Sequence, residues 1–352
     1  MIQVMIIDDS PAIRAQFRGL LEAEPDMEVV AEAEDPIVAR RLLDRVSPDV
    51  ITLDVEMPRM DGLAFLRKLM AGRPTPVVMA STLTQHGAEV TLEALRIGAV
   101  AAVGKPTPGH PASLEDFAEE LVREVRAAAA ARVGRSQPRA AGPRLGAVAG
   151  GGRLVAIGAS TGGTEAIRAI LARLPAACPP IAIVQHMPAG FTATFAAHLD
   201  REVAPRVVEA ADGMALGPGT VAVAPGDAHL EVAAAGGGWR LAVVAGERVN
   251  RHRPSVDVLF HSVARAAGPR AVGVLLTGMG ADGAAGLKAM RDAGAHTLAQ
   301  DRESCTVYGM PRAAVQLGAA EAEVPLERMA HAILKAAAHA GASARAPIAS
   351  QS

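Results

Sequence analysis

The chain has 352 residues, and because domains usually contain about 100–200 residues, this length predicts two domains. Half of the residues are hydrophobic, which excludes intrinsic disorder for most of the chain. The 35 Lys and Arg residues nearly balance the 37 Asp and Glu residues, which argues against a nucleic-acid-binding protein that relies on overall positive charge.

The first ~130 residues alternate short apolar runs with longer amphipathic stretches. The last amphipathic stretch extends from about residue 113 to 132. Because strands that alternate with helices form parallel sheets, we expect one α/β domain with a doubly wound parallel sheet. Its expected strands cover residues 3–7, 28–31, 50–53, 76–80 and 100–103.

Residues 126–152 lose this periodicity and are rich in Ala, Gly, Pro and Arg. From residue 126 to 153 there are six Arg and no acidic residue. The composition is typical of a flexible, solvated linker. The alternative is an electrostatic contact with an acidic partner.

A second α/β domain is expected over residues 153–340. A buried-strand pattern at 154–157 precedes a helical pattern from Thr164, which predicts a second doubly wound, mostly parallel sheet. Residues 341–352 read as a disordered tail. The further expected strands cover residues 181–184, 221–224, 241–244 and 271–276.

Polar residues follow the expected strands of the first domain. Asp8 and Asp9 end the first strand, Asp54 the third and Ser81 the fourth, and Lys105 follows the fifth. The carboxyl ends of parallel strands meet at one edge of a sheet, where ligands bind. Three carboxylates there suit Mg²⁺, and the hydroxyl and ammonium can stabilise a phosphoryl group.

With the motifs DD, LDVEMPRMDG, ST and GKP, residues 1–125 resemble the response-regulator receiver domain. The resemblance implies a flavodoxin-like (βα)5 fold with strand order 2-1-3-4-5. It also implies that Asp54 is the phosphoacceptor and that Asp8, Asp9 and Asp54 hold Mg²⁺. Ser81 becomes the switch hydroxyl, and Lys105 contacts the phosphate.

One residue departs from the receiver pattern. Receivers often carry an aromatic switch residue three positions before the conserved lysine, where this chain has Ala102. Phosphorylation does not require that ring, but we expect no aromatic-rotamer relay to the second domain.

The second domain carries the motif GASTG at residues 158–162, which matches G-x-S-x-G. This motif places Ser160 on a sharp turn between a strand and a helix, with the Thr161 backbone N–H as a candidate oxyanion donor. His186 and Asp282 follow two other expected strands and can supply the base and its orienting carboxylate. Taken singly, each also fits an ordinary loop residue, and His229, His252 and His261 are competing histidines in this domain.

Six motifs together settle the choice among these residues: IGASTGGTEA, VQHMPAGFT, APGDAHL, NRHRPSVDVLF, LLTGMGADGAAGL and AQDRESCTVYGMPR. They are similar to the catalytic domain of the chemotaxis protein-glutamate methylesterases, the CheB family, over about residues 154–335. The resemblance implies a catalytic triad of Ser160, His186 and Asp282, with the Met279 backbone at the oxyanion site. It implies no cofactor for the esterase reaction.

The resemblance therefore implies a phosphorylation-regulated enzyme of chemotactic adaptation. It would hydrolyse glutamate methyl esters, and deamidate glutamines, on methyl-accepting chemoreceptors, with a chemotaxis sensor histidine kinase as phosphodonor. The unphosphorylated receiver is expected to cover the active site. We expect a monomer that binds no nucleic acid.

Membrane insertion is not expected, since no apolar stretch reaches the roughly 18 residues of a span. MIQVMIIDDS has no charged n-region typical of a signal peptide. Cys178 and Cys305 have no CxxC spacing, so neither a disulfide framework nor a zinc site is expected, and Cys305 reads as an inert buried thiol. A cytoplasmic location fits these features.

Three other functions fit the sequence less well. A response regulator with a non-catalytic output domain would not need Ser, His and Asp together, and a transcriptional regulator would need a basic recognition surface. A dinucleotide-dependent oxidoreductase would need the G-x-G-x-x-G order, which GASTGG lacks. The basic patch of residues 248–253, with Arg248, Arg251, His252 and Arg253, is either a binding surface for Glu-rich receptor helices or a solvated loop.

Overall fold

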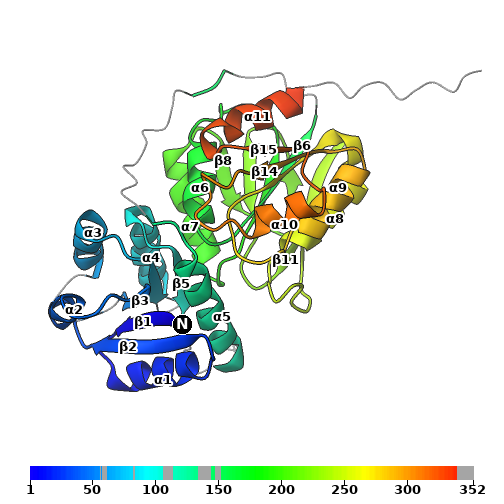
Figure 1. Ribbon diagram of the computed structural model, residues 1–352. Helices are drawn as coiled ribbons and strands as arrows, with labels where there is room; N and C mark the ends of the chain where they lie inside the picture. Colours follow the sequence, from blue (N-terminus) through cyan, green and yellow to red (C-terminus); the bar gives the residue numbers. More distant parts are fainter. Residues whose placement is uncertain are drawn as a thin grey trace, which may run out of the picture.

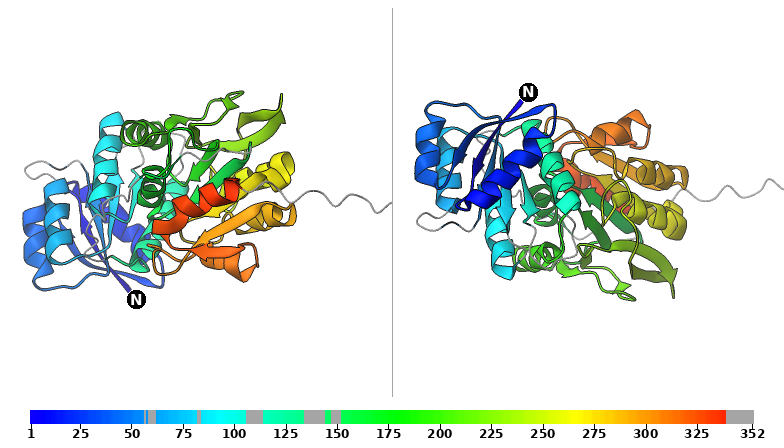
Figure 2. Two further views of the ribbon diagram at one scale, coloured as in Figure 1. Left: turned by 90° about the horizontal axis from the view of Figure 1, so that it is seen from above. Right: turned by 90° about the horizontal axis from the view of Figure 1, so that it is seen from below.

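The computed structural model describes residues 1–55, 57, 62–81, 84–105, 114–133, 144–146 and 152–338. Two α/β domains lie side by side in Figure 1, with the N-terminal domain in blue to blue-green and the C-terminal domain in green to red. Figure 2 shows the same pairing from above and below. None of the helices in the described ranges combines the length and apolar character needed to cross a bilayer.

The N-terminal domain is a five-stranded parallel sheet of order β2-β1-β3-β4-β5, which confirms the expected receiver fold. Local signals begin its first helices: Ser10 and Asp35 cap α1 and α2, and each helix starts with Pro. Its elements are β1 Ile2–Ile7, α1 Pro11–Glu22, β2 Met27–Ala33, α2 Pro36–Leu43, β3 Val50–Asp54, α3 Gly62–Gly72, β4 Val77–Ser81, α4 Gln85–Ile97, β5 Ala101–Gly104 and α5 Leu114–Ala129.

The C-terminal domain contains a seven-stranded parallel sheet of order β15-β14-β13-β6-β7-β10-β8. The elements that build or cover this sheet are β6 Leu154–Ala159, α6 Gly163–Leu171, β7 Ile181–Gln185, α7 Phe191–Glu202, β8 Arg206–Glu209, β10 Thr220–Val223, α8 Val256–Ala267, η1 Gly268–Arg270, β13 Ala271–Leu275, α9 Ala284–Asp292, β14 His296–Gln300, α10 Met310–Gln316, β15 Ala322–Val324 and α11 Leu326–Ala338. The doubly wound, mostly parallel domain expected from the sequence is confirmed.

A separate antiparallel sheet accompanies the parallel one. It has the order β11-β12-β9, with β9 Ala215–Leu216, β11 His229–Ala235 and β12 Gly238–Val244. The sequence patterns indicated only the end of β12, and they missed β8, β14 and β15 of the parallel sheet. β8 and β15 are short, partly exposed edge strands with a weak apolar signal. β14 lies next to an edge and is mostly buried, but three of its five residues (HTLAQ) are polar, so its apolar signal is also weak.

In each parallel sheet the strand order changes direction at one strand, and the candidate sites lie at the end of that strand. The first strand of each domain, β1 or β6, has its successor on one side and a later strand on the other. Ligands bind in the crevice beyond the carboxyl ends of strands at such a switch point. Asp8 and Asp9 follow β1, and Ser160 follows β6.

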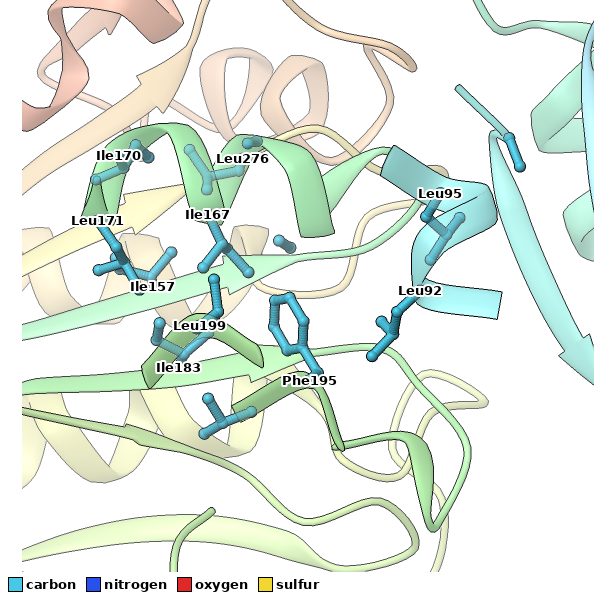
Figure 3. Close-up of a cluster of buried hydrophobic side chains, with 14 of the residues drawn as sticks. Leu92, Leu95, Ile157, Ile167, Ile170, Leu171, Ile183, Phe195, Leu199 and Leu276 are labelled. Atoms are coloured by element: carbon cyan, nitrogen blue, oxygen red, sulfur yellow. The ribbon is translucent and has the colours of Figure 1, made fainter. Parts of the chain in front are cut away.

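The two domains share a continuous apolar contact. Leu92 and Leu95 of α4 belong to the same buried cluster as Ile167 of α6 and Phe195 and Leu199 of α7. Figure 3 shows the two leucines pointing from α4 toward Phe195. Helix α4 of the receiver is therefore packed against α6 and α7, and α6 follows the turn that carries Ser160.

The predicted linker differs from the structure at its start. Helix α5 continues to Ala129, so residues 126–129 are helical, and the acidic partner of Arg126 lies within the chain: its guanidinium contacts Glu24 and Asp26, each at 2.6 Å. Further along, Leu145 N–H bonds to the Arg173 carbonyl at 2.9 Å. Most of the remaining linker, and the tail at 341–352, lie outside the described residues.

Candidate active site and phosphoacceptor site

The receiver site gathers the residues that the sequence placed at strand ends. Asp8, Asp9 and Asp54 each offer a carboxylate oxygen, and these oxygens lie within 4.8 Å of one another. Lys105 Nζ lies 2.7 Å from both Asp8 Oδ2 and Asp54 Oδ1. Burial alone would lower the pKa of Lys105, but the two carboxylates outweigh it and raise that pKa, so the ammonium stays charged.

These residues fit the metal and the phosphoryl group that receivers use. Three clustered carboxylates are the hard oxygen ligands that Mg²⁺ prefers. Ser81 is fully buried at the end of β4, only four residues before α4 begins. A change at Ser81 thus has a short path to the helix whose Leu92 and Leu95 contact the second domain.

Ala102, the residue that replaces the usual aromatic, lies at the contact between the two domains. It is partly buried on β5, packs against the cluster shared by the domains, and lines the cavity between them. Because Ala102 has only a methyl group, the larger receiver side chains that contact the second domain or line the cavity come from α4 and α5.

The turn after β6 has the shape that the G-x-S-x-G motif predicts. The Ser160 N–H bonds to the Thr277 carbonyl at 3.0 Å, and the residue lies in the turn between β6 and α6. Gly162 has φ 77°, and a Cβ there would lie 2.4 Å from Thr306 Oγ1. At Gly158 an added Cβ would lie 2.2 Å from Val256 Cγ1. Both glycines are needed for the close packing of this turn against Val256 and Thr306.

His186 and Asp282 form a direct hydrogen bond, with 2.8 Å between His186 Nε2 and Asp282 Oδ2. Oδ2 also accepts from the Val256 N–H at 2.7 Å, and Oδ1 accepts from Asn250 Nδ2 and from Ser255 Oγ, each at 2.8 Å. Burial alone would raise the pKa of Asp282, but these hydrogen bonds lower it well below the usual value. The carboxylate is therefore held ionised and fixed in orientation.

The other ring nitrogen of His186, Nδ1, is not engaged by Asp282. Nδ1 is buried and has no hydrogen-bond partner among the described residues, while His186 and Ser160 line the same cavity. Because Asp282 accepts from Nε2, the neutral ring carries its proton on Nε2 and has a lone pair on Nδ1. Nδ1 is thus the atom that can accept the serine proton.

His252 is stacked on the ring of His186. The ring centroids are 3.7 Å apart and the planes differ by 9°. Burial, and then the neighbouring His186, lower the pKa of His252 to about 2, so this ring is neutral at physiological pH. A neutral stacked ring fixes the plane of His186 without adding a competing charge.

The two candidate oxyanion donors differ in position. Thr161 is buried and lines the cavity with Ser160. Met279 follows β13 on the same edge of the sheet, is partly buried, and does not line the cavity. The Thr161 side chain is already engaged, since its Oγ1 donates to Glu124 Oε2 of the receiver at 3.1 Å.

The receiver closes one side of the active-site cavity. Asp116, Glu120, Arg123 and Glu124 of α5 line it together with Ser160 and catalytic-domain residues. Ion pairs join the domains beside it, from Arg248 to Asp116 at 3.0 Å and from Arg96 to Glu202 at 3.4 Å. Helix α5 therefore forms part of the wall of the cavity that Ser160 lines.

Sequence reasoning missed several positioning residues. Gln185 Nε2 donates to the Ser160 and His186 carbonyls at 2.9 and 3.1 Å and so ties the two turns together. Asn250 and Ser255 lie within the motif NRHRPSVDVLF, and both donate hydrogen bonds to Asp282, a role that the sequence pattern did not indicate. Burial raises the pKa of the Cys305 thiol to about 12, which agrees with its reading as inert.

Comparisons with known proteins agree with both halves of this description. A family model described as "Response regulator receiver domain" matches residues 4–115, and one described as "CheB methylesterase" matches residues 155–333. A protein of Bordetella bronchiseptica named protein-glutamate methylesterase/protein-glutamine glutaminase is 53% identical over 337 residues, covering 95% of this chain and 96% of that protein. A Caulobacter vibrioides protein named protein-glutamate methylesterase/protein-glutamine glutaminase 1 is 52% identical over 337 residues, covering 95% and 97%.

Among solved structures, the crystal structure of the Thermotoga maritima CheB methylesterase catalytic domain resembles this chain. It has a TM-score of 0.51 and 36% identity, and it covers 52% of this chain and 98% of that one.

Proposed function

The chain belongs to the CheB methylesterase family, with a response-regulator receiver domain ahead of the catalytic domain, and we propose how its residues carry out that activity. It is a phosphorylation-regulated protein-glutamate methylesterase and protein-glutamine glutaminase of chemotaxis. Its substrates are glutamate methyl esters and glutamines on chemoreceptor helices. The observation that carries the proposal is that Ser160 and His186 line one cavity while the buried Asp282 binds His186 Nε2.

In the proposed mechanism Ser160 is the nucleophile. Its Oγ attacks the carbonyl carbon of the substrate side chain while His186 Nδ1 takes the hydroxyl proton. The tetrahedral oxyanion is stabilised by backbone N–H groups, for which Thr161 and Met279 are the candidates. His186 then protonates the departing methanol, or ammonia from glutamine, and water hydrolyses the acyl-serine with the same base.

Asp282 acts throughout as an ionised orienting group. Its hydrogen bonds from Val256, Asn250 and Ser255 hold it against His186 Nε2 and leave Nδ1 free for Ser160. The imidazolium formed during each proton transfer is stabilised by that carboxylate.

Control by the receiver follows from the cavity. Asp54 is the proposed phosphoacceptor, and Asp8, Asp9 and Asp54 would hold the Mg²⁺ that shields phosphate charge during transfer. A phosphoryl group at Asp54 adds negative charge beside Ser81 and Lys105, and the loop into α4 responds. Displacement of α4 and α5 then opens the cavity. A chemotaxis histidine kinase is the proposed phosphodonor, and we propose that the protein acts as a cytoplasmic monomer.

Methanol release from methyl-labelled receptor membranes tests the proposal. We expect wild type to release methanol, Mg²⁺ with a small phosphodonor to increase the rate, and Ser160→Ala to release none above background. Retention of activity in Ser160→Ala would contradict the assignment of the nucleophile. Activity without any response to phosphodonor would contradict the regulation but not the chemistry.

A further inference from the structure

Three carboxylates of the receiver form a row on helix α5. Asp116, Glu120 and Glu124 are spaced four residues apart, so they lie within about 80° of the helix circumference at 100° per residue. All three line the cavity that contains Ser160 and His186. The row faces the proposed catalytic residues.

The end of the row nearest the nucleophile is a buried glutamate. Glu124 is 7% exposed, and its Oε2 accepts a hydrogen bond from Thr161 Oγ1, on the residue next to Ser160. A glutamate carboxylate on a helix is also the product of the proposed esterase reaction. Glu124 is therefore a chemical copy of the product, held beside the nucleophile by the catalytic domain.

The catalytic-domain wall opposite the row is basic. Arg248, Arg251 and Arg253 line the same cavity, and Arg248 Nη1 lies 3.0 Å from Asp116 Oδ1. Arg253 is already held by Asp227 and by the Gly246 carbonyl within its own domain. Arg248 instead pairs with Asp116 of the receiver. Movement of the receiver after phosphorylation would break this ion pair and leave Arg248 open to another carboxylate.

We propose that α5 occupies the place of the substrate helix, so that its carboxylate row records how a receptor helix binds. The esterified glutamate takes the place of Glu124 at Thr161, and a carboxylate eight residues earlier takes the place of Asp116 at Arg248. Eight helical residues span about 12 Å, so Arg248 would bind a substrate carboxylate about 12 Å along the helix from the reacting bond. This inference rests on the proposed function and adds the register in which the substrate binds.

The arrangement makes autoinhibition a competition between like ligands. Receiver and substrate present the same charges to Arg248 and Thr161, so only one helix can bind at a time. A mutation of Arg248 must then have two effects at once: weaker docking of the receiver, and weaker binding of an acidic substrate helix. A purely steric lid would show only the first effect.

Helical peptides that carry one glutamate methyl ester test the register. One peptide has a glutamate eight residues before the ester, a second has glutamine there, and a third has lysine. Methanol release by the full-length protein is measured with Mg²⁺ and phosphodonor for wild type, Arg248→Asp and Arg265→Asp. Arg265 is a matched control, because it forms an exposed ion pair with Glu231 and does not line the cavity.

We expect Arg248→Asp to raise the KM of the glutamate peptide at least tenfold and to prefer the lysine peptide, while Arg265→Asp leaves the order of the three peptides unchanged. The double variant Asp116→Arg, Arg248→Asp should regain a low rate without phosphodonor, because the ion pair is restored in reverse, yet keep the lysine preference. That result also shows that both variants fold.

Three outcomes overturn the inference: equal KM values for wild type and Arg248→Asp, no preference for lysine, or turnover of methyl-labelled receptor without turnover of the glutamate peptide. In each of these the proposed methylesterase function stands. Failure of wild type to release methanol from receptor and peptides alike would instead contradict the proposed function itself.

Discussion

Replacing Asp282 by Asn changes one atom at the centre of the proposed triad. The wild-type carboxylate only accepts hydrogen bonds: His186 and Val256 donate to Oδ2, and Asn250 and Ser255 donate to Oδ1. An amide NH₂ in place of either oxygen faces at least one fixed donor. With NH₂ at Oδ2 it opposes the Val256 N–H, and at Oδ1 it opposes the Asn250 side-chain amide.

The consequence for catalysis depends on the tautomer of His186. An NH₂ group toward Nε2 makes that nitrogen the acceptor, so the ring proton moves to Nδ1, which then cannot take the Ser160 proton. A wrong tautomer of this kind lowers kcat by about 10⁴-fold in serine hydrolases. One unsatisfied buried donor costs about 1–3 kcal/mol of folding free energy, or about 3–9 °C in Tm for a domain of this size.

The assay is methanol release with Mg²⁺ and phosphodonor, together with thermal unfolding of the same samples. Asp292→Asn is the matched control, since that aspartate pairs with Lys288 on the exposed face of α9 and should change neither quantity measurably. A kcat for Asp282→Asn within tenfold of wild type would refute the assignment of Asp282 as the group that sets the tautomer.

The other predictions concern regulation and the position of the nucleophile. Asp54→Ala should abolish stimulation by phosphodonor and keep the basal rate, measured as the ratio of methanol release with and without phosphodonor; a preserved ratio would argue against Asp54 as phosphoacceptor. Burial raises the pKa of Glu120 from 4.5 to about 7, so docking of the receiver is favoured at low pH and weakens as pH rises from 4.5 to about 7. The unphosphorylated rate, relative to the phosphorylated rate, should therefore rise between pH 4.5 and about 7 and level off above it, and Glu120→Gln should flatten that profile; an unchanged profile would exclude Glu120 as its cause. Gly278→Ala would place a Cβ 2.7 Å from Ser160 Cβ, and a shift of the nucleophile by about 1 Å should lower kcat about 10²-fold; a normal kcat would mean that the turn tolerates the methyl group.

The receiver site could be inferred from sequence because it depends on short-range rules. Each of Asp8, Asp54, Ser81 and Lys105 follows an apolar run, and parallel strands bring their carboxyl ends to one edge whatever the loops do. Lys105 Nζ accordingly lies 2.7 Å from the carboxylates of Asp8 and Asp54, which follow other strands of the same sheet. The roles of these residues remain predictions that the phosphodonor assays test.

The esterase constellation was less accessible to local reasoning. Ser160 lies in a recognisable turn motif, but His186 and Asp282 each look like ordinary loop residues, and only the family motifs selected them from the competing histidines. The pairing of β6 with both β7 and β13 brings all three to one switch point. No periodicity in the chain encodes that strand order.

What the sequence by itself determined is the pair of α/β domains, their helix and strand alternation, and the residues at strand ends. Apolar periodicity and capping are local, so they can be read along the chain. Only the tertiary structure decided that α5 lies across the active site, that Thr161 binds Glu124, and that Arg248 binds Asp116. Contacts between domains depend on surface complementarity over long sequence separations, for which a single chain carries no local signal.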